Sequence, residues 1–215
     1  MPTSAQHQNR ERFDAIAAGW DDNPTRRALA TDVAEAIAAA LPLQADWHAL
    51  EYGCGTGLVG AALAPKLAGL LACDVSPGML SVLEQKARAA GLDQLHTRVL
   101  DLTSEAPPAE RFDVIFSSMT MHHIPDVAAL VRTFHGMLTP GGWLALADLD
   151  TEDGSFHGGD VPGVMHQGFD RAALQADLRA AGFADTSART AHTVAKTAAD
   201  GRVNHYPVFL ITARA

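Results

Sequence analysis

The chain has 215 residues, of which 47% are hydrophobic and 19% charged, and its formal net charge is −9 with His neutral. This composition predicts one globular domain with a sizeable core, and the acidic balance argues against a nucleic-acid partner because phosphate contacts need clustered Lys and Arg. Two cysteines give no disulfide framework, and the first ten residues lack the apolar core of a signal peptide. No apolar run reaches the roughly 18 residues that a membrane span needs. We therefore expect a cytoplasmic protein.

Helices are predicted for residues 1–45, which we interpret as a helical cap ahead of the main fold. Val33, Ile37 and Leu41 recur at the spacing of one helix face. Pro42 then ends the helix, because proline cannot continue the backbone hydrogen bonding.

The segment from Phe13 to Asp21 leaves two interpretations open. In the first, Phe13, Ile16 and Trp20 lie on one buried face of a helix, as their spacing allows. In the second, Trp20 closes over a ligand bound at the end of the sheet. The sequence does not decide between them.

Strands alternating with helices are predicted from Trp47 to about residue 181. Such alternation implies a parallel sheet with helices on both faces, and right-handed crossovers bring the strand ends to one edge, where ligands bind. Two further strands in the tail, near 186–194 and 206–212, predict an antiparallel hairpin. The predicted fold is one α/β domain with a Rossmann-like, mostly parallel seven-stranded sheet: strands near 47–52, 69–74, 96–101, 112–117 and 142–148, and helices near 58–68, 76–90, 126–138 and 170–181.

A glycine-rich turn follows the first of these strands. The strand ends in Glu51, and Gly53, Gly55 and Gly57 leave no Cβ between the backbone and a ligand. The helix that begins there also offers free N–H groups. Asp74 follows Gly53 by 21 residues, close to the offset at which a carboxylate binds a ribose in nucleotide-binding βαβ units. The alternative for Asp74 is a helix N-cap, but the combination predicts a nucleoside-containing cofactor.

One candidate cofactor is a nicotinamide dinucleotide, as in an NAD(P)-dependent oxidoreductase, because Gly55 to Gly60 fits the pattern G-x-G-x-x-G. A pyrophosphate gains nothing from Glu51, however, whereas a ligand with an ammonium group does. Asp101, at the end of the third strand, is placed to accept a hydrogen bond from an adenine amino group. A dinucleotide fold also does not require the antiparallel tail, and the Tyr-x-x-x-Lys pair of short-chain dehydrogenases is missing.

Five motifs occur in order along residues 46–150: Glu51 to Gly57, Asp74, Asp101, Phe112 to Ser118, and Leu138 to Leu144. Together they resemble the class I S-adenosylmethionine-dependent methyltransferases. The resemblance implies that S-adenosyl-L-methionine is the cofactor and S-adenosyl-L-homocysteine the product, with Asp74 on the ribose and Asp101 and the backbone of Leu102 on the adenine. The cofactor-binding residues that it implies are Trp20, Glu51, Gly53, Gly55, Gly57, Asp74, Val75, Met79, Asp101, Leu102 and Ser117.

The methyl acceptor is expected to be a small molecule beneath a lid formed by residues 151–168, in the C-terminal part 151–215. This connection is long for its place in the fold, and it mixes glycines, aromatic residues and histidines. Four histidines are candidate general bases, although each can instead be an ordinary hydrogen-bonded or surface residue. They are His122, His123, His157 and His166.

No metal is expected, although the lid carries acidic residues and histidines. Metal-using relatives place an acid just past the fourth strand, where this chain has Ser117, Ser118 and Met119. We expect direct displacement at the sulfonium methyl, with no nucleic-acid or membrane partner. A non-catalytic S-adenosylmethionine-binding protein stays open as an alternative, as do the acceptor atom and the oligomeric state.

Overall fold

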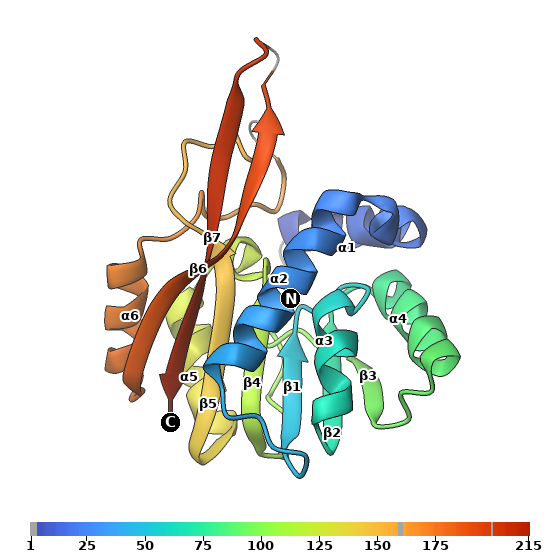
Figure 1. Cartoon of the computed structure of the whole chain (residues 1–215), viewed down its shortest axis with the longest axis vertical. Helices are drawn as coiled ribbons and strands as arrows, with labels where there is room; N and C mark the ends of the chain where they lie inside the picture. Colours follow the sequence, from blue (N-terminus) through green and yellow to red (C-terminus); the bar gives the residue numbers. More distant parts are fainter. Residues whose placement is uncertain (1–3, 159–160, 199) are drawn as a thin grey trace.

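A seven-stranded sheet in the order β3-β2-β1-β4-β5-β7-β6 forms the centre of the computed structural model (Figure 1), which describes residues 4–158, 161–198 and 200–215. The first five strands pair in parallel, and β7 runs antiparallel to both β5 and β6. This confirms the predicted fold. The strands are β1 (His48–Tyr52), β2 (Gly69–Asp74), β3 (Leu95–Val99), β4 (Phe112–Ser118), β5 (Leu138–Leu149), β6 (Ala184–Thr197) and β7 (Val203–Arg214).

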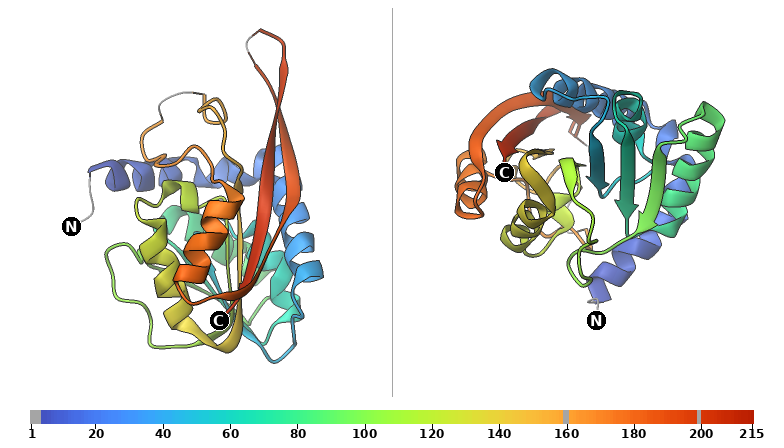
Figure 2. Two further views of the ribbon diagram at one scale, coloured as in Figure 1. Left: turned by 90° about the vertical axis from the view of Figure 1, so that its left-hand side faces the viewer. Right: turned by 90° about the horizontal axis from the view of Figure 1, so that it is seen from below.

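Helices cover both faces of the sheet (Figure 2). One buried cluster joins the sheet to α2 (Pro24–Ala40), α3 (Leu58–Leu63) and α4 (Pro77–Ala90), and a second joins the other face to α5 (Val127–Met137) and α6 (Arg171–Ala180). The short 3-10 helices η2 (Ala64–Lys66) and η3 (Met121–His123) continue α3 and follow β4. Within the described residues, no helix is both long and apolar enough to cross a bilayer.

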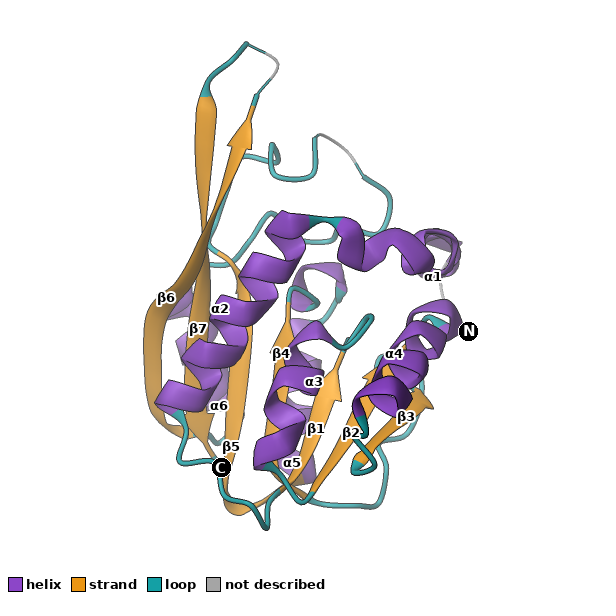
Figure 3. Ribbon diagram, turned by 45° about the vertical axis from the view of Figure 1, so that its right-hand side comes forward, coloured by secondary structure: helices purple, strands orange, loops and turns teal. Residues whose placement is uncertain are grey.

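The N-terminal cap lies across one end of the sheet (Figure 3). It consists of α1 (Ser4–Ile16) and the 3-10 helix η1 (Ala17–Asp22), which lie at that end, and of α2, which runs from there over one face of the sheet. The last of these begins with Asn23, whose Oδ1 accepts the backbone N–H of Thr25 at 2.9 Å, followed by Pro24 at the first helical position. It ends at Ala40, just before Pro42 as predicted. The cap therefore covers the edge at which the parallel strands end.

Three details differ from the prediction. β3 ends at Val99, so Asp101 lies in the following turn instead of closing the strand. The helix predicted at 58–68 ends at Leu63 and continues as a 3-10 turn, because Pro65 has no N–H for the α-helical ladder. The tail strands are longer than predicted, and their hairpin projects beyond the sheet (Figure 1).

Candidate active site

A cavity of about 680 Å³ opens at the ends of the parallel strands. Its floor comes from the turns that follow β1, β2, β3 and β4, and its roof from α1, η1, α2, the segment after β5 and the strand β6. Of the predicted site residues, those that line it are Trp20, Glu51, Gly53, Gly55, Asp74, Val75, Met79, Asp101, His122, His123 and His157.

Gly55 is the residue of the glycine-rich turn that faces empty space. Its φ is +53°, and a Cβ built there would meet no protein atom within 4 Å. At Gly53, with φ +71°, a Cβ would lie 2.2 Å from Thr120, whose Oγ1 donates to the Gly53 carbonyl. Gly57 does not line the cavity: its φ is +74° and a Cβ would lie 2.2 Å from Leu83. Gly57 therefore lets the turn pack against α4, and its contact with the cofactor stays a prediction.

Glu51 places a buried carboxylate beneath the turn. The residue is 2% exposed, and its Oε2 has no hydrogen-bond partner among the described residues. Burial raises the pKa of Glu51 to about 8, against the opposing effect of the Gly60 amide. A Cβ at Gly60 would lie 2.1 Å from Oε2, so the glycine at this position makes room for the carboxylate.

Asp74 ties the glycine-rich turn to the end of β2. Its Oδ2 accepts the Gly55 N–H at 2.8 Å, and its Oδ1 accepts the Ser76 N–H at 2.9 Å. Burial raises the pKa of Asp74, although the amides of Ser76 and Gly55 oppose this shift. Ser76, not Asp74, is the N-cap of α4, because its Oγ accepts the Met79 N–H. The alternative interpretation of Asp74 as an N-cap is wrong.

Two aspartates of the cap fasten it to the cofactor half, which sequence reasoning did not foresee. Asp14 accepts hydrogen bonds from the Ser76 hydroxyl at 2.5 Å and the Gly78 N–H at 2.8 Å. Asp21 accepts from Thr56 Oγ1 and pairs with Lys86, each at 2.6 Å. In each of the pairs Phe13–Asp14 and Trp20–Asp21, the aromatic ring lines the cavity and the aspartate binds the cap to the cofactor half.

Trp20 lies in η1 and lines the cavity, as does Phe13 of α1. Their rings meet edge to face with centroids 5.6 Å apart, and the guanidinium carbon of Arg26 lies 3.8 Å from the Trp20 ring centroid. Ile16 is 37% exposed. The alternative in which Phe13, Ile16 and Trp20 share one buried helix face is wrong, because α1 ends at Ile16 and the chain turns there.

Asp101 faces the cavity in the turn after β3, where its carboxylate accepts from the Thr103 N–H at 2.9 Å and from Ser104 Oγ at 2.9 Å. Leu102 differs from the prediction. It is buried outside the cavity lining, and its N–H donates to Tyr52 Oη at 3.3 Å. The backbone of Leu102 is therefore engaged in the core instead of being free for an adenine.

Ser117 is also displaced from its predicted role. Its side chain is buried, and its Oγ donates to the Tyr52 carbonyl at 2.8 Å. β4 continues to Ser118, and the cavity is lined by Ser118, Met119 and Thr120. Neighbouring strand residues point to opposite faces, so a difference of one residue in the strand end exchanges a lining side chain for a core one.

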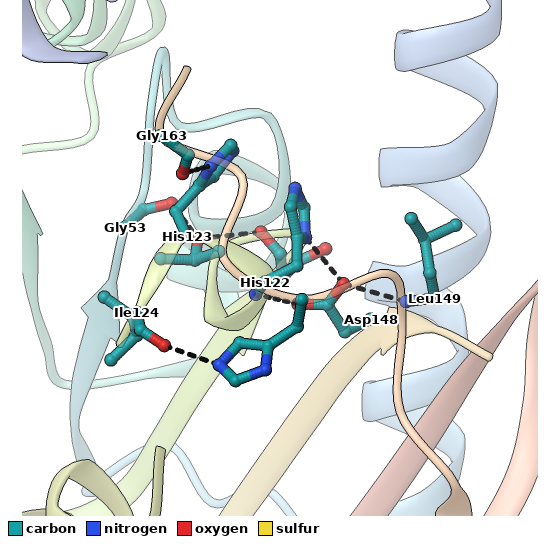
Figure 4. A network of polar contacts seen from close by, with 10 residues as sticks. Gly53, His122, His123, Ile124, Asp148, Leu149 and Gly163 are labelled. Atoms are coloured by element: carbon teal, nitrogen blue, oxygen red, sulfur yellow. Dashed lines mark hydrogen bonds and ion pairs between the residues drawn. The ribbon is translucent and has the colours of Figure 1, made fainter. Parts of the chain in front are cut away.

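His122 and Asp148 form a buried pair at the cavity wall (Figure 4). His122 Nδ1 lies 2.7 Å from Asp148 Oδ1, and the two residues are 2% and 0% exposed. The carboxylate also accepts the backbone N–H groups of His122 and Leu149. Burial alone would raise the pKa of Asp148, but the charge and hydrogen bond of His122 bring it below its ordinary value.

The other three histidines have different surroundings. His123 Nδ1 lies 2.7 Å from the Gly163 carbonyl oxygen, and burial lowers the pKa of His123 to about 3 (Figure 4). His157 lines the cavity with a buried Nε2 that has no partner in the described chain, and burial followed by the charge of His122 lowers its pKa to about 4. His166 does not line the cavity; its Nε2 lies 2.8 Å from the Ile124 carbonyl oxygen. The ring of His166 therefore holds the segment after β5 against the residue that follows η3, and a catalytic role for it stays a prediction.

The predicted lid, residues 151–168, is described except for 159 and 160. Phe156 and His157 reach the cavity, whereas the backbone N–H groups of Met165 and His166 donate to the His122 carbonyl. The lid thus contacts the loop that carries the His122–Asp148 pair. In the parts of the chain that the structure describes, no three side chains of His, Cys, Asp or Glu gather as a metal site would need.

Comparison with known proteins assigns the chain to a family. A family model described as a methyltransferase domain matches residues 50–144. The chain belongs to the class I methyltransferases. The match covers the glycine-rich turn, Asp74, Asp101 and the His122 loop, and so confirms the resemblance that the sequence motifs indicated.

Individual relatives agree with this assignment. An uncharacterized methyltransferase of Schizosaccharomyces pombe is 32% identical over 132 residues, or 55% of this chain and 46% of that protein. A ubiquinone biosynthesis O-methyltransferase of Xanthomonas euvesicatoria is 31% identical over 157 residues, or 70% of this chain and 64% of that protein. The chain thus matches about half to two thirds of these relatives' lengths. The solved complex of DhpI with S-adenosylhomocysteine has the same fold, with a TM-score of 0.74 at 20% identity over 100% of this chain and 98% of the other.

Proposed function

We propose that this protein binds S-adenosyl-L-methionine in the cavity at the strand ends and transfers its methyl group to a small-molecule acceptor. The observation that carries the proposal is Glu51, a buried carboxylate with an unpartnered oxygen at the floor of the cavity. A buried polar atom without a partner costs free energy unless a ligand satisfies it. The ammonium group of the cofactor's methionine part is a ligand of the right charge.

Other residues of the cavity fit the rest of this cofactor. Asp74 and Asp101 line it at the ends of the two strands beyond β1, where a ribose and an adenine would follow the methionine part. Gly55 leaves an open approach to the backbone of the turn. A volume of about 680 Å³ also lies in the range of small-molecule sites. The acceptor would lie under Phe156 and His157, beside His122.

When bound, the cofactor supplies a methyl group on a sulfonium, and the carbon–sulfur electrons return to sulfur as the acceptor's lone pair bonds to the carbon. His122 takes the proton that the acceptor loses. With the proton on Nδ1 donated to Asp148, Nε2 is the basic nitrogen of His122. The cap, the lid and the aromatic rings orient the acceptor, and positioning supplies much of the rate.

The oxidoreductase alternative loses its main support in this structure. Gly60, the last glycine of the G-x-G-x-x-G match, has a different physical explanation, because a Cβ there would strike Glu51 Oε2. A pyrophosphate would also gain nothing from the Glu51 carboxyl group beneath the turn, whereas an ammonium group would. The alternative of a non-catalytic binder is decided by turnover alone. The cytoplasmic location expected from the sequence stays a prediction.

The test is to titrate the protein with S-adenosylhomocysteine and with NADH in parallel calorimetry. We expect the first to bind and the second not to. Gly55→Val should abolish the binding of S-adenosylhomocysteine in a protein that still unfolds cooperatively, since the open space at Gly55 is where the cofactor approaches. Binding of NADH alone, or wild-type affinity in the folded variant, would refute the proposed cofactor site.

A further inference from the structure

Three cationic side chains converge on the roof of the cavity. Arg12 comes from α1, Arg26 from α2 and Lys196 from β6, and all three line the cavity. Within residues 4–158, 161–198 and 200–215, none of them forms an ion pair with a carboxylate. Arg10, which also lines the cavity, is different because it pairs with Asp14 at 3.9 Å. The acidic residues of the lining come from the floor: they are Glu51, Asp74, Asp101 and Glu105.

Aromatic rings hold two of these cations in place. Lys196 Nζ lies 3.6 Å from the centroid of the Phe156 ring and donates to the Phe156 carbonyl at 2.5 Å. The guanidinium of Arg26 stacks on Trp20 and donates to the Trp20 carbonyl at 3.3 Å. Ring faces and carbonyl oxygens attract cations without neutralising them. Both side chains are half-buried, so their charges remain available to a ligand in the cavity.

The cations also act on one another and on His157. Burial and then the charge of Arg12 lower the pKa of Arg26. Burial, His122, Lys196 and Arg12, in that order, lower the pKa of His157 to about 4. Glu152 acts on the pKa of Lys196 in the opposite direction. Its Oε2 accepts the Phe156 N–H, its Oε1 is buried without a hydrogen-bond partner, and it forms no ion pair with any residue that the structure describes. The roof is therefore a region of positive potential that an anion would relieve.

The proposed cofactor cannot supply enough negative charge. S-adenosylmethionine carries a sulfonium, an ammonium and a single carboxylate. We assign that carboxylate to Arg26, which stacks on Trp20 at the methionine end. Arg12 and Lys196 then remain without an anionic partner, on the side of the cavity that holds His157 and its unpartnered Nε2.

We propose that the methyl acceptor is an acidic small molecule whose carboxylate, phosphate or phosphonate group binds between Arg12 and Lys196, next to His157, with its methyl-accepting atom toward His122. The proposal rests on the proposed function and narrows its acceptor class. It excludes amines and other cations as the preferred acceptors, because Arg12, which is exposed, and Lys196, which is half-buried, would repel them.

The test uses protein saturated with S-adenosylhomocysteine and four probes of one shape: benzoate, phenylphosphonate, benzamide and benzylamine. Calorimetry should show that benzoate or phenylphosphonate binds about tenfold or more tightly than benzamide, because hydrogen bonds to charged groups exceed neutral ones. Benzylamine should bind least. The two acids distinguish a carboxylate from a phosphonate or phosphate as the preferred group. Equal binding of the acids and benzamide would overturn the proposal.

Matched variants locate the anion site. Lys196→Met and Arg12→Gln should each lower the ratio of acid-probe affinity to benzamide affinity about tenfold, and Lys196→Arg should retain the wild-type ratio. Arg27→Gln is the control, since Arg27 neighbours Arg26 in α2 but does not line the cavity. An unchanged preference in both Lys196→Met and Arg12→Gln would overturn the proposal. Failure of wild-type protein to bind S-adenosylhomocysteine would instead refute the proposed function, so the two failures are distinguishable.

Discussion

The imidazole of His122 and the carboxylate of Asp148 meet in the interior, with Nδ1 2.7 Å from Oδ1. The two residues come from the loop after β4 and from β5, which are neighbours in the sheet, so the pairing of these strands sets the distance. Because the two residues are buried and the carboxylate also accepts two backbone N–H groups, the ring has one orientation. With Nδ1 engaged by Asp148, the proposed function uses the other ring nitrogen, Nε2, as the base.

Asp148→Asn should therefore lower turnover much more than cofactor affinity. An amide can donate to Nδ1, which moves the ring proton to Nε2 and removes the base, for a loss of about 10²-fold or more. It should also lower the free energy of unfolding by about 1–3 kcal/mol, since a buried backbone donor loses its partner. Single-turnover rates, S-adenosylhomocysteine titration and thermal melting separate these effects.

His122→Gln is the companion variant. It should lose as much turnover as Asp148→Asn, and the double variant should lose little more, because residues that act as a unit are not additive. Full turnover in a folded His122→Gln protein would show that the transfer needs no base from this pair.

Binding of S-adenosylhomocysteine should release up to one proton near pH 7. The pKa of Glu51 is about 8 in the ligand-free protein, so the group is protonated at pH 7, and an ammonium group favours its ionised form. Calorimetry in two buffers of different ionisation enthalpy measures the release. Glu51→Gln should release no proton and bind more weakly; no proton release by wild-type protein would contradict the assignment of Glu51.

The same group makes stability depend on pH. Its folded pKa of about 8 lies above the ordinary value of 4.5, so the stability linked to its protonation is present below pH 4.5 and is lost as the pH rises to 8. Glu51→Gln should remove this dependence and raise the free energy of unfolding of the ligand-free protein at pH 8 by on the order of 3 kcal/mol. Denaturant unfolding at pH 5 and pH 8 checks the sign.

Asp74→Ala should weaken S-adenosylhomocysteine binding by roughly 1.5–3 kcal/mol, the worth of charged hydrogen bonds to a ribose. Part of the lost affinity would be indirect, because Asp74 also accepts the Gly55 N–H and so holds the glycine-rich turn in place. Ser76→Ala is the matched variant, because it removes the N-cap of α4 and should lower stability by about 1 kcal/mol with a smaller effect on affinity. Equal affinity of Asp74→Ala and wild type would remove Asp74 from the site.

His157→Ala and His166→Ala should differ, although both lie in the lid. His157 lines the cavity and should affect turnover with the true acceptor while leaving S-adenosylhomocysteine affinity nearly unchanged. His166 bonds the Ile124 carbonyl outside the cavity and should lower the melting temperature instead. Turnover rates and melting curves of the two variants test this difference. Normal turnover in His157→Ala together with reduced turnover in His166→Ala would place the acceptor elsewhere.

The sequence predicted the parts of the site that lie within one short segment. The turn from Glu51 to Gly57 and the acid at Asp74 are readable because spacing along the chain fixes them. Ser117 and Leu102 lie in the core instead of the cavity lining. The side chain of Ser117 donates to the Tyr52 carbonyl and the N–H of Leu102 donates to Tyr52 Oη, and the local sequence pattern reveals neither contact.

The residues that sequence reasoning missed are those that only tertiary structure brings together. Asp148 lies near the end of β5, and its partnership with His122 depends on the pairing of β4 and β5, which no local pattern shows. Lys196 reaches the cavity because β6 extends beyond its predicted end at Val194. No spacing rule connects it to Arg12, which lies in α1.

The most direct measurement of the central claim uses S-adenosylmethionine with an isotopic label in the methyl group. The protein is incubated with a small-molecule extract divided by ion exchange into acidic, neutral and basic fractions. The account predicts a labelled small-molecule product from the acidic fraction together with an equal amount of S-adenosylhomocysteine, and its loss in His122→Gln. Binding of S-adenosylhomocysteine with no labelled product from any fraction, or label only on protein or nucleic acid, would contradict it.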